Sequence, residues 1–593
     1  MRKYKTRDEI PKQYKWNMNK IFKCKEDFDK NFEIITKEVE TISSLKKDFI
    51  KSGKNLYKAL IEINDLSLKV NNLYMYAKKF YDVDSIKSSN QELMSLVENL
   101  YVIFSSNVNF IETEIIKIKN INNFYNEEPK LKEFTYFIDE ILRSKKHILS
   151  AKEENLLSLS SNIRNGYESV FENLEATDVK FSDFTIDNVK YELTHGNYSN
   201  YLKNDNPLVR KQAFINYHEY FKKHANTFYN CLINNFKNDN FLAKVKHYKS
   251  AIQMSMDSDA VPVSLFDNLV KTVHKNINLL HRFVSLKKKL NKLEEIHMYD
   301  MYYPMFKNKD KKYSVDEAIS LVKNSLSMMP EEYRNVVSKC FAENWVDFYE
   351  TPGKCTGAFS SGTYDTDPII LMNFDETFNS VETLAHELGH SMHSYYSHKY
   401  NPYQTSSYPI LLAEIASNVG ELLLFDYILK NSTDIDEKKM ILETILSSFK
   451  GSIFRQTQFA EFEKAIHEKE QNNEPLSMEN VTNYYLELNK YYYGNDFIND
   501  DDIKYECLRI PHFYYNFYVY KYATGLAVAY VFAKRIINKE KNAINDYIEF
   551  LKSGGRDKPL NVLKNCNVDL SQSKILDEAM ELFNNYMTEL ENL

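Results

Sequence analysis

Turn-forming residues are scarce in this chain, and that scarcity is the strongest constraint on its fold. Glycine and proline number only 13 each among 593 residues, well below average usage, so few signals end helices or form hairpins. Apolar residues instead recur at spacings of three and four through 72–85, 88–104, 207–245 and 409–470. This is the period of an amphipathic helix. The sequence therefore predicts a mainly α fold without internal repeats.

Two segments break the helical pattern. Residues 174–195 alternate apolar and polar side chains as a strand does. We expect them to separate an N-terminal helical domain, residues 1–190, from a helical domain that covers 191–593. Residues 350–374 contain three glycines and end in the apolar run IILMNF. Because glycine allows close approach of two backbones, we expect a hairpin whose edge strand lies beside the next helix.

Charge and hydropathy exclude several classes of protein. The chain is 43% hydrophobic and 27% charged, with a net charge of −7, whereas a nucleic-acid binder would have a basic surface. No apolar run approaches the roughly 18 residues of a membrane span, and the N-terminus lacks the apolar core of a signal peptide. Six separated cysteines without a C-x-x-C pair predict reduced thiols. We expect a cytoplasmic protein that binds neither nucleic acid nor membranes.

Residues 384–393, LAHELGHSMH, contain the motif HExxH. On a helix of 3.6 residues per turn, His386 and His390 lie one turn apart on the same face, which suits two imidazoles that share a cation. Glu387 lies about a hundred degrees round the helix, where it can reach a water molecule without binding the metal. The alternative is an ordinary helix that is rich in histidine, because the motif also occurs by chance.

A catalytic zinc site needs a third protein ligand and leaves its fourth position to water. His393 is a poor candidate, because it lies about 10 Å of helix rise from His386. The first acid after the motif is Glu414, in the apolar stretch YPILLAEIASNVGELLLF, where a carboxylate is unfavourable unless it is paired or binds a metal. We expect this stretch to return antiparallel to the HExxH helix and to supply Glu414. The alternatives are His398 as ligand and a solvent-facing role for Glu414, which Glu421 also fits.

A second group of polar side chains occurs in residues 509–525, RIPHFYYNFYVYKYATG. If one helix follows the proline, a histidine and three tyrosines share about 120° of its surface. These are His512, Tyr515, Tyr518 and Tyr522. An imidazole or a phenol can donate a hydrogen bond to the oxyanion that develops during acyl transfer. Because the chain contains 44 tyrosines, the alternative is an aromatic stripe that belongs to the core.

These motifs together resemble a known family. HELGHSMH, LLAEIASNV and IPHFYYNFYVYKYATG, with GKCTGAFSSGTY before them and RDEIPKQYKWNM near the N-terminus, are similar to oligoendopeptidase F, of the thimet-oligopeptidase-type zinc metallopeptidases. The resemblance covers most of the chain and is most specific through 350–425 and 505–530. Cys355 and Gly420 depart from the family pattern, and neither is an expected ligand.

The resemblance implies a large helical, zincin-like peptidase with a deep substrate channel and a small β-sheet beside the zinc helix. It implies one Zn(2+) per chain and short unstructured peptides as substrates. His386, His390 and Glu414 match the zinc ligands. Glu387 matches the general base, which accepts a proton from the attacking water and passes it to the leaving amine. Two other functions stay open: a metal-free helical scaffold, and a related helical zinc carboxypeptidase.

The resemblance also assigns roles around the metal. The segment that contains His512 and the three tyrosines matches residues that bind the oxyanion and the substrate. We expect catalytic roles for His512, Tyr515 and Tyr522, and substrate binding by Tyr518. Gly357 and Ala358 match an edge strand that pairs with the backbone of a bound peptide, a form of strand addition.

Overall fold

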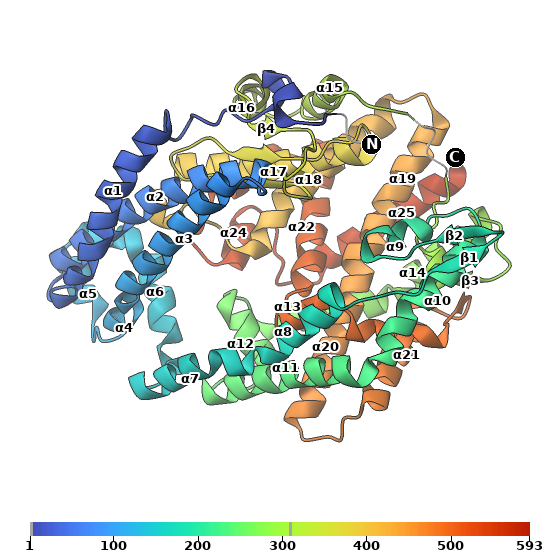
Figure 1. Ribbon diagram of the computed structural model, residues 1–593, viewed down its shortest axis with the longest axis horizontal. Helices are drawn as coiled ribbons and strands as arrows, with labels where there is room; N and C mark the ends of the chain where they lie inside the picture. The colour runs from blue at the N-terminus through green and yellow to red at the C-terminus, as the bar shows by residue number, and fades with distance from the viewer. Residues whose placement is uncertain (1–3, 307–310) are drawn as a thin grey trace. The chain divides into compact units, whose positions relative to one another are not determined.

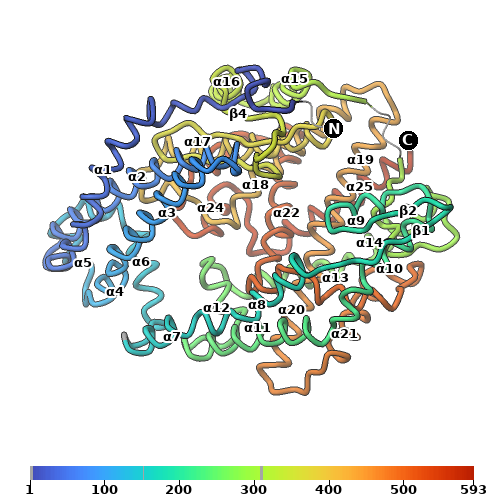
Figure 2. The backbone as a smooth tube through the Cα atoms, viewed as in Figure 1, coloured from blue at the N-terminus to red at the C-terminus, as the bar shows by residue number. Residues whose placement is uncertain are grey.

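The computed structural model describes residues 4–306 and 311–593. Helices account for most of them (Figure 1), which confirms the mainly α fold. Contacts between Cα atoms divide the chain into two compact units, each built from three segments whose paths Figure 2 traces. Unit 1 comprises Met1–Lys146, Asp310–Tyr427 and Phe532–Asn567, and unit 2 comprises His147–Lys309, Ile428–Val531 and Val568–Leu593.

The expected domain boundary at residue 190 does not coincide with a boundary between these units. Residue 190 lies inside unit 2, whereas residues 1–146 belong to the same unit as the HExxH motif. The division into 1–190 and 191–593 therefore stays a prediction about sequence regions.

Within its described residues, unit 1 contains six N-terminal helices, three in its middle segment and two in its last segment, besides the part of α18 (Ile410–Asn431) up to Tyr427 and the part of α22 (Tyr520–Ile537) from Phe532 on. The eleven are α1 (Lys25–Thr41), α2 (Gly53–Val83), α3 (Ser88–Val108), α4 (Phe110–Ile115), α5 (Ile121–Glu127), α6 (Thr135–Ser144), α15 (Val315–Ser325), α16 (Glu331–Ala342), α17 (Phe378–Tyr400), α23 (Ala543–Lys552) and α24 (Pro559–Asn565). Helices α1, α2 and α3 bury a shared apolar core that includes Phe28, Leu73 and Val97.

Unit 2 is also built mainly from helices, and α22 (Tyr520–Ile537) begins in it. The others are α7 (Ala151–Arg164), α8 (Gly166–Glu172), α9 (His195–Tyr201), α10 (Pro207–Lys223), α11 (Ala225–Val245), α12 (Ala251–Ser258), α13 (Val263–Lys275), α14 (Ile277–Leu290), α19 (Ile435–Phe449), α20 (Arg455–Gln471), α21 (Met478–Tyr493) and α25 (Lys574–Asn592). Two of its strands, β3 (Ile296–His297) and β7 (Phe497–Ile498), pair in parallel.

A three-stranded sheet in unit 1 confirms the hairpin expected within 350–374. Strand β5 (Phe359–Ser361) pairs antiparallel with β6 (Ile369–Leu371), and β6 pairs in parallel with β4 (Val346–Asp347). The order β4-β6-β5 leaves β5 at an edge, and both hairpin strands pack against α17. The small β-sheet beside the HExxH helix is therefore present.

Residues 7–16 contact this sheet through one buried carboxylate, that of Asp347. Asp347 is fully buried and forms ion pairs with Arg7, at 2.5 Å, and with Lys354, at 2.8 Å. It also accepts a hydrogen bond from the backbone N–H of Trp16, whose indole N–H donates to the carbonyl of Ile370. These contacts place residues 7–16 in the same unit as the motif helix.

The strand pattern of residues 174–195 is confirmed only in part. Strands β1 (Phe184–Ile186) and β2 (Val189–Tyr191) form an antiparallel hairpin. Its two turn residues, Asp187 and Asn188, have φ of 51° and 64°, as tight two-residue hairpin turns require. Residues 173–177 form a π-helical turn instead of a strand.

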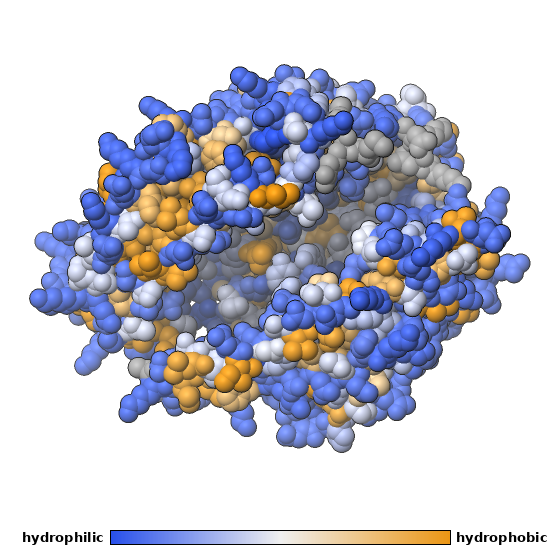
Figure 3. All heavy atoms as spheres, viewed as in Figure 1, coloured by the Kyte–Doolittle hydropathy of each residue, from blue (hydrophilic) through white to orange (hydrophobic). Residues whose placement is uncertain are grey.

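The face shown in Figure 3 is largely hydrophilic and also carries several patches of apolar residues. Among the described residues, no helix combines the length and the apolar character that a membrane span requires.

Candidate metal centre

Helix α17 carries His386, Glu387 and His390. It begins after Thr377, whose side chain accepts a hydrogen bond from the backbone N–H of Ser380, the usual role of a threonine at this position. Helices α15, α16 and α23 pack around α17. The helix is therefore held in a buried position from which its histidines can project toward α18.

Two glycines set how closely α17 and α18 approach. A Cβ atom added to Gly389 would lie 2.5 Å from the carbonyl oxygen of Ala416, and one added to Gly420 would lie 2.6 Å from that of Ala385. Neither distance leaves room for a methyl group. Because residue 389 faces 416 and residue 385 faces 420, the helices run antiparallel, as expected. Gly420, one of the two residues that differ from the family pattern, thus lies where the two helices cross.

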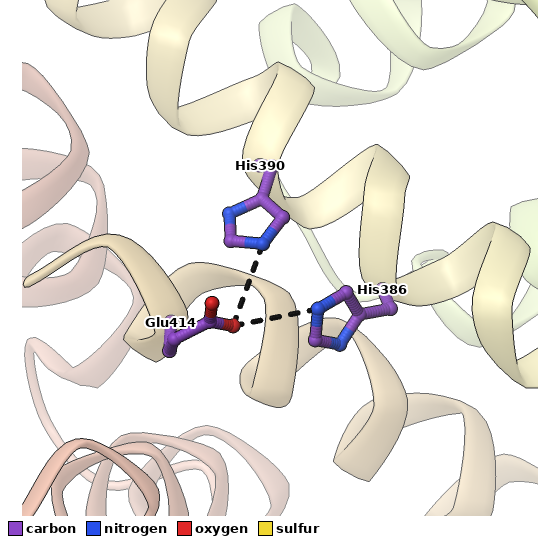
Figure 4. Close-up of side chains that lie close together, drawn as sticks. All are labelled: His386, His390 and Glu414. Carbon is purple, nitrogen blue, oxygen red and sulfur yellow. Dashed lines mark ion pairs between the residues drawn. The ribbon is translucent and has the colours of Figure 1, made fainter. Parts of the chain in front are cut away.

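This crossing brings together His386, His390 and Glu414, the only His, Cys, Asp or Glu group within the described residues that could hold a metal ion. The Nε2 atoms of both histidines lie 3.4 Å from Oε2 of Glu414 (Figure 4). Tetrahedral zinc with bonds of about 2.05 Å separates its ligand atoms by about 3.3 Å. Charge-assisted hydrogen bonds are shorter, about 2.7–2.9 Å. The donor set and its spacing therefore fit zinc.

Glu421 contributes a contact that the sequence interpretation missed. Its Oε1 lies 2.7 Å from Nδ1 of His386, so Nε2 of that imidazole is directed to Glu414. Carboxylates that hold the second nitrogen of a ligating histidine are a regular feature of zinc sites. The solvent-facing role considered for Glu421 is wrong. The available signal was its position two helical turns after Glu414, on the same face.

The electrostatics of the group favour a cation. Burial opposes charge on His386, but hydrogen bonds to Glu414 and Glu421 outweigh it and raise the pKa of His386 to about 10. Burial likewise opposes charge on Glu414, yet hydrogen bonds from His386 and His390 hold the pKa of its carboxyl well below the usual range. Positive charge is therefore stabilised at the point where the three donor atoms meet.

Glu387 is buried beside the metal ligands without belonging to the donor set. Its Oε2 is buried and has no hydrogen-bond partner in the part of the chain that the structure describes. Burial raises the pKa of Glu387, whereas positive charge on His386 and His390 lowers it. A carboxylate with a free oxygen and a raised pKa is suited to accept a proton from water.

The other two histidines of this helix lie outside the donor set. His393 is fully buried and stacks on Tyr408 at 3.7 Å between ring centroids. Its place outside the donor set agrees with its distance from His386 along the helix. His398 lies 5.7 Å from Tyr364, measured in the same way. Since Glu414 is the third member of the group, the geometry gives no support to His398 as a ligand.

Gly357 and Ala358 lie directly before the edge strand rather than within it, because β5 begins at Phe359. Gly357 has a φ of 78°, and its carbonyl oxygen accepts a hydrogen bond from the side chain of Asn373. The strand thus begins one residue after Ala358, and the substrate-binding role expected of Gly357 and Ala358 stays a prediction. The strand itself lies against α17, where Ser360 Oγ is 2.8 Å from Ser391 Oγ.

The segment that follows Pro511 is not one helix, which corrects the spacing argument. A short 3₁₀ turn covers Pro511–Tyr514, and α22 begins only at Tyr520. Between them the backbone turns through Asn516 and Phe517, with φ of 44° and 57°. Left-handed backbone at two successive residues cannot continue a right-handed helix.

The four side chains nevertheless form one cluster in unit 2. The ring of His512 lies 5.8 Å from Tyr515, 6.2 Å from Tyr518 and 5.9 Å from Tyr522, between centroids. Tyr515 is half exposed, so this cluster is not simply core. Burial lowers the pKa of His512, which favours a neutral imidazole. The cluster is present, but a joint site with the metal ligands of unit 1 stays a prediction.

Comparison with known proteins identifies the family. The sequence pattern of Peptidase family M3 matches residues 200–582, and that of Oligopeptidase F matches residues 116–181. Oligopeptidase PepF of Bacillus subtilis is 38% identical over 99% of this chain and 88% of its own length. Group B oligopeptidase PepB of Streptococcus agalactiae is 36% identical over 99% of this chain and 98% of its own.

A solved structure supports the same assignment. The crystal structure of oligoendopeptidase-F from Enterococcus faecium matches with a TM-score of 0.73 and 31% sequence identity, over 96% of this chain and 99% of that one. Full-length sequence similarity, a shared mainly α fold and the matched family patterns agree. The chain therefore belongs to peptidase family M3, within its oligoendopeptidase F group.

Proposed function

We propose that this M3 peptidase is a zinc-dependent endopeptidase that hydrolyses internal bonds of short, unstructured oligopeptides. The observation that carries the proposal is the spacing of His386, His390 and Glu414. The Nε2 atom of each histidine lies 3.4 Å from Oε2 of Glu414. Several relatives are named oligopeptidases or oligoendopeptidases, which supports the substrate class and the internal cleavage.

The three ligands would hold one zinc ion, with His386 oriented by Glu421. A zinc ion in this position supplies Lewis-acid chemistry, which makes water nucleophilic near neutral pH and polarises a carbonyl group. Glu387 accepts the proton of the attacking water on its free Oε2. The same carboxyl then passes the proton to the nitrogen of the leaving amine.

The remaining residues bind and orient the peptide. A hydrogen bond from His512, Tyr515 or Tyr522 stabilises the oxyanion as it develops, while Tyr518 contacts the substrate. The free edge of β5 offers backbone groups to an extended peptide. Its position against α17 supports a bound peptide that runs past Glu387.

A digest of a peptide library, analysed by mass spectrometry with and without a chelator, tests the proposal. We expect internal fragments, complete loss of activity in the chelator and recovery when zinc is restored. Release of single C-terminal residues would instead support a zinc carboxypeptidase. A protein that binds no zinc and cleaves nothing would support the metal-free scaffold.

Substrate length is a separate test. A peptide must be extended to add to β5, and a folded domain would first have to unfold, at about 5–15 kcal/mol. In a ladder of peptides with one well-folded protein, we expect cleavage to fall steeply beyond about two dozen residues. Equal cleavage of a folded domain and a ten-residue peptide would contradict the restriction to oligopeptides.

A further inference from the structure

The backbone between His512 and Tyr518 adopts a conformation that its sequence does not favour. Asn516 and Phe517 are both left-handed, a region that side chains other than glycine seldom occupy in succession. Phe517 is almost fully buried and lies against Phe266 and His467. A turn of this kind persists only where surrounding contacts enforce it.

Three side chains from three helices of unit 2 bind the main chain of this turn. Asn235 of α11 donates to the carbonyl of Phe513 at 2.8 Å, and Ser255 of α12 donates to that of Asn516 at 2.6 Å. Glu463 of α20 accepts the backbone N–H of Phe517 on Oε1 at 2.7 Å. The backbone that carries the cluster is thus fixed on both sides of Tyr515.

Glu463 is unusual among these anchors, because it is an acid in a fully buried position. Within the described residues it forms no ion pair, and its Oε2 has no hydrogen-bond partner. Burial, reinforced by the nearby Asp239, raises the pKa of Glu463 well above its ordinary value. A neutral carboxyl that accepts a single backbone bond fits these surroundings, since an unpaired buried charge would be strongly unfavourable.

We propose that Glu463 is a positioning residue for the His512–Tyr522 cluster, acting through its hydrogen bond to the backbone of Phe517. The inference rests on the proposed function, which gives the cluster its role toward the oxyanion and the substrate. Without this acceptor the Phe517 N–H would be buried and unpaired, and the left-handed turn would relax to satisfy it. Such a change moves the rings on both sides of the turn.

Two substitutions distinguish the effect of losing the hydrogen-bond acceptor at residue 463 from the effect of changing the size of the side chain. Glu463→Met keeps the length of the side chain but removes the oxygen, whereas Glu463→Gln keeps an oxygen that can accept the Phe517 N–H. We expect Glu463→Met to lower kcat on an oligopeptide at least tenfold, because the lost oxyanion interactions act in the transition state, and to raise KM as well, because Tyr518 contacts the substrate. Glu463→Gln should stay within threefold of the wild type. Equal activity in both variants would overturn the proposal.

A double-mutant cycle distinguishes this inference from the proposed function. In a background where Tyr515, Tyr518 and Tyr522 are all changed to Phe, Glu463→Met should lower kcat by less than twofold further, because the two changes disable the same cluster. If Glu463→Met lowers kcat as much in this background as in the wild type, Glu463 does not act through the tyrosines. That result would overturn its positioning role without affecting the role proposed for the tyrosines. Wild-type turnover in the triple variant would overturn the role of the tyrosines and with it the purpose assigned to Glu463.

Ser255 provides a milder variant in case Glu463→Met does not fold. Ser255→Ala removes only the bond to the carbonyl of Asn516, and we expect a smaller fall in kcat and a smaller rise in KM. Ser258→Ala is the matched control, because that hydroxyl bonds within its own helix. Zinc content should be full in every variant. Equal kcat in the two serine variants would contradict the proposed anchoring.

Discussion

The Oε1 atom of Glu421 lies 2.7 Å from Nδ1 of His386, and this contact decides which nitrogen of the imidazole faces the metal site. The two residues lie on different helices, so the contact depends on how α17 and α18 cross. It also adds negative charge beside a ligand of a cation.

Removing this carboxylate should weaken zinc binding without removing a ligand. We expect Glu421→Leu to lower zinc affinity about 10–100-fold. Glu421→Gln should have a smaller effect, because its amide oxygen can still accept the Nδ1–H. Competition with a chromophoric chelator measures both affinities. Unchanged affinity in Glu421→Leu would show that His386 does not need this partner.

The glycines at the helix crossing should not tolerate a side chain. Gly420→Ala places a Cβ 2.6 Å from the carbonyl oxygen of Ala385, so α17 and α18 must separate. We expect a loss of about 1–3 kcal/mol in the free energy of unfolding, as in other overpacked sites, together with weaker zinc binding.

Gly166→Ala is the matched control for Gly420→Ala, because no other described residue beyond its chain neighbours and its own helix backbone comes within 4 Å of the added Cβ. Alanine is the better helix former, so this variant should be neutral or more stable by up to about 1 kcal/mol. Thermal unfolding and zinc content measure both variants. A Gly420→Ala protein with full stability and full zinc would contradict the close crossing.

Glu414→Ala should release zinc, because it leaves only two protein ligands. His398→Ala should keep one zinc per chain, since that residue lies outside the donor set. Elemental analysis of the two purified variants provides the comparison. Stoichiometric zinc in Glu414→Ala, or its loss in His398→Ala, would transfer the ligand role to His398.

Zinc binding should displace a proton. The carboxylates of Glu414 and Glu421 outweigh burial and raise the pKa of His386 from 6.5 to about 10, so the metal-free imidazole is protonated at neutral pH. A ligating imidazole must be neutral. This one proton should therefore contribute a fall of about tenfold in apparent zinc affinity for each unit that pH decreases below 10.

The same shift has a consequence for metal-free stability. A raised folded-state pKa stabilises the metal-free protein fully below pH 6.5, and this contribution is lost as pH rises toward 10. Calorimetry of zinc binding at pH 8, in buffers of different ionisation enthalpy, counts the protons released. We expect about two, one from His386 and one from the zinc-bound water, whose pKa falls to about 7, and a value of about one would contradict the protonated state of His386.

The sequence predicts the group of His386, His390 and Glu414 that could hold a metal ion, because the spacing of its members is local or constrained. His386 and His390 are one helical turn apart, and Glu414 is the first acid after the motif. Glu421 could not be distinguished from a solvent-facing acid, since its partner depends on a helix crossing set by Gly389 and Gly420. Its position two turns after Glu414 indicated the shared helix face, but not that His386 would be its partner.

The His512–Tyr522 cluster shows a different limit. Helical spacing grouped four residues whose rings do lie together, but the helix is interrupted at Asn516 and Phe517. Asparagine tolerates left-handed backbone, so Asn516 was the available signal for a turn. Phenylalanine at the next position carries no such signal, because its conformation is imposed by Glu463 and by burial.

Measurement of turnover and zinc content in Glu387→Gln tests the account most directly. The amide cannot accept the proton of water, whereas the ligands His386, His390 and Glu414 are unchanged. We predict one zinc per chain and a loss of kcat of about 10²–10⁴-fold on an oligopeptide. A Glu387→Gln protein with full zinc and wild-type turnover would contradict the assignment of Glu387 as the general base of this site.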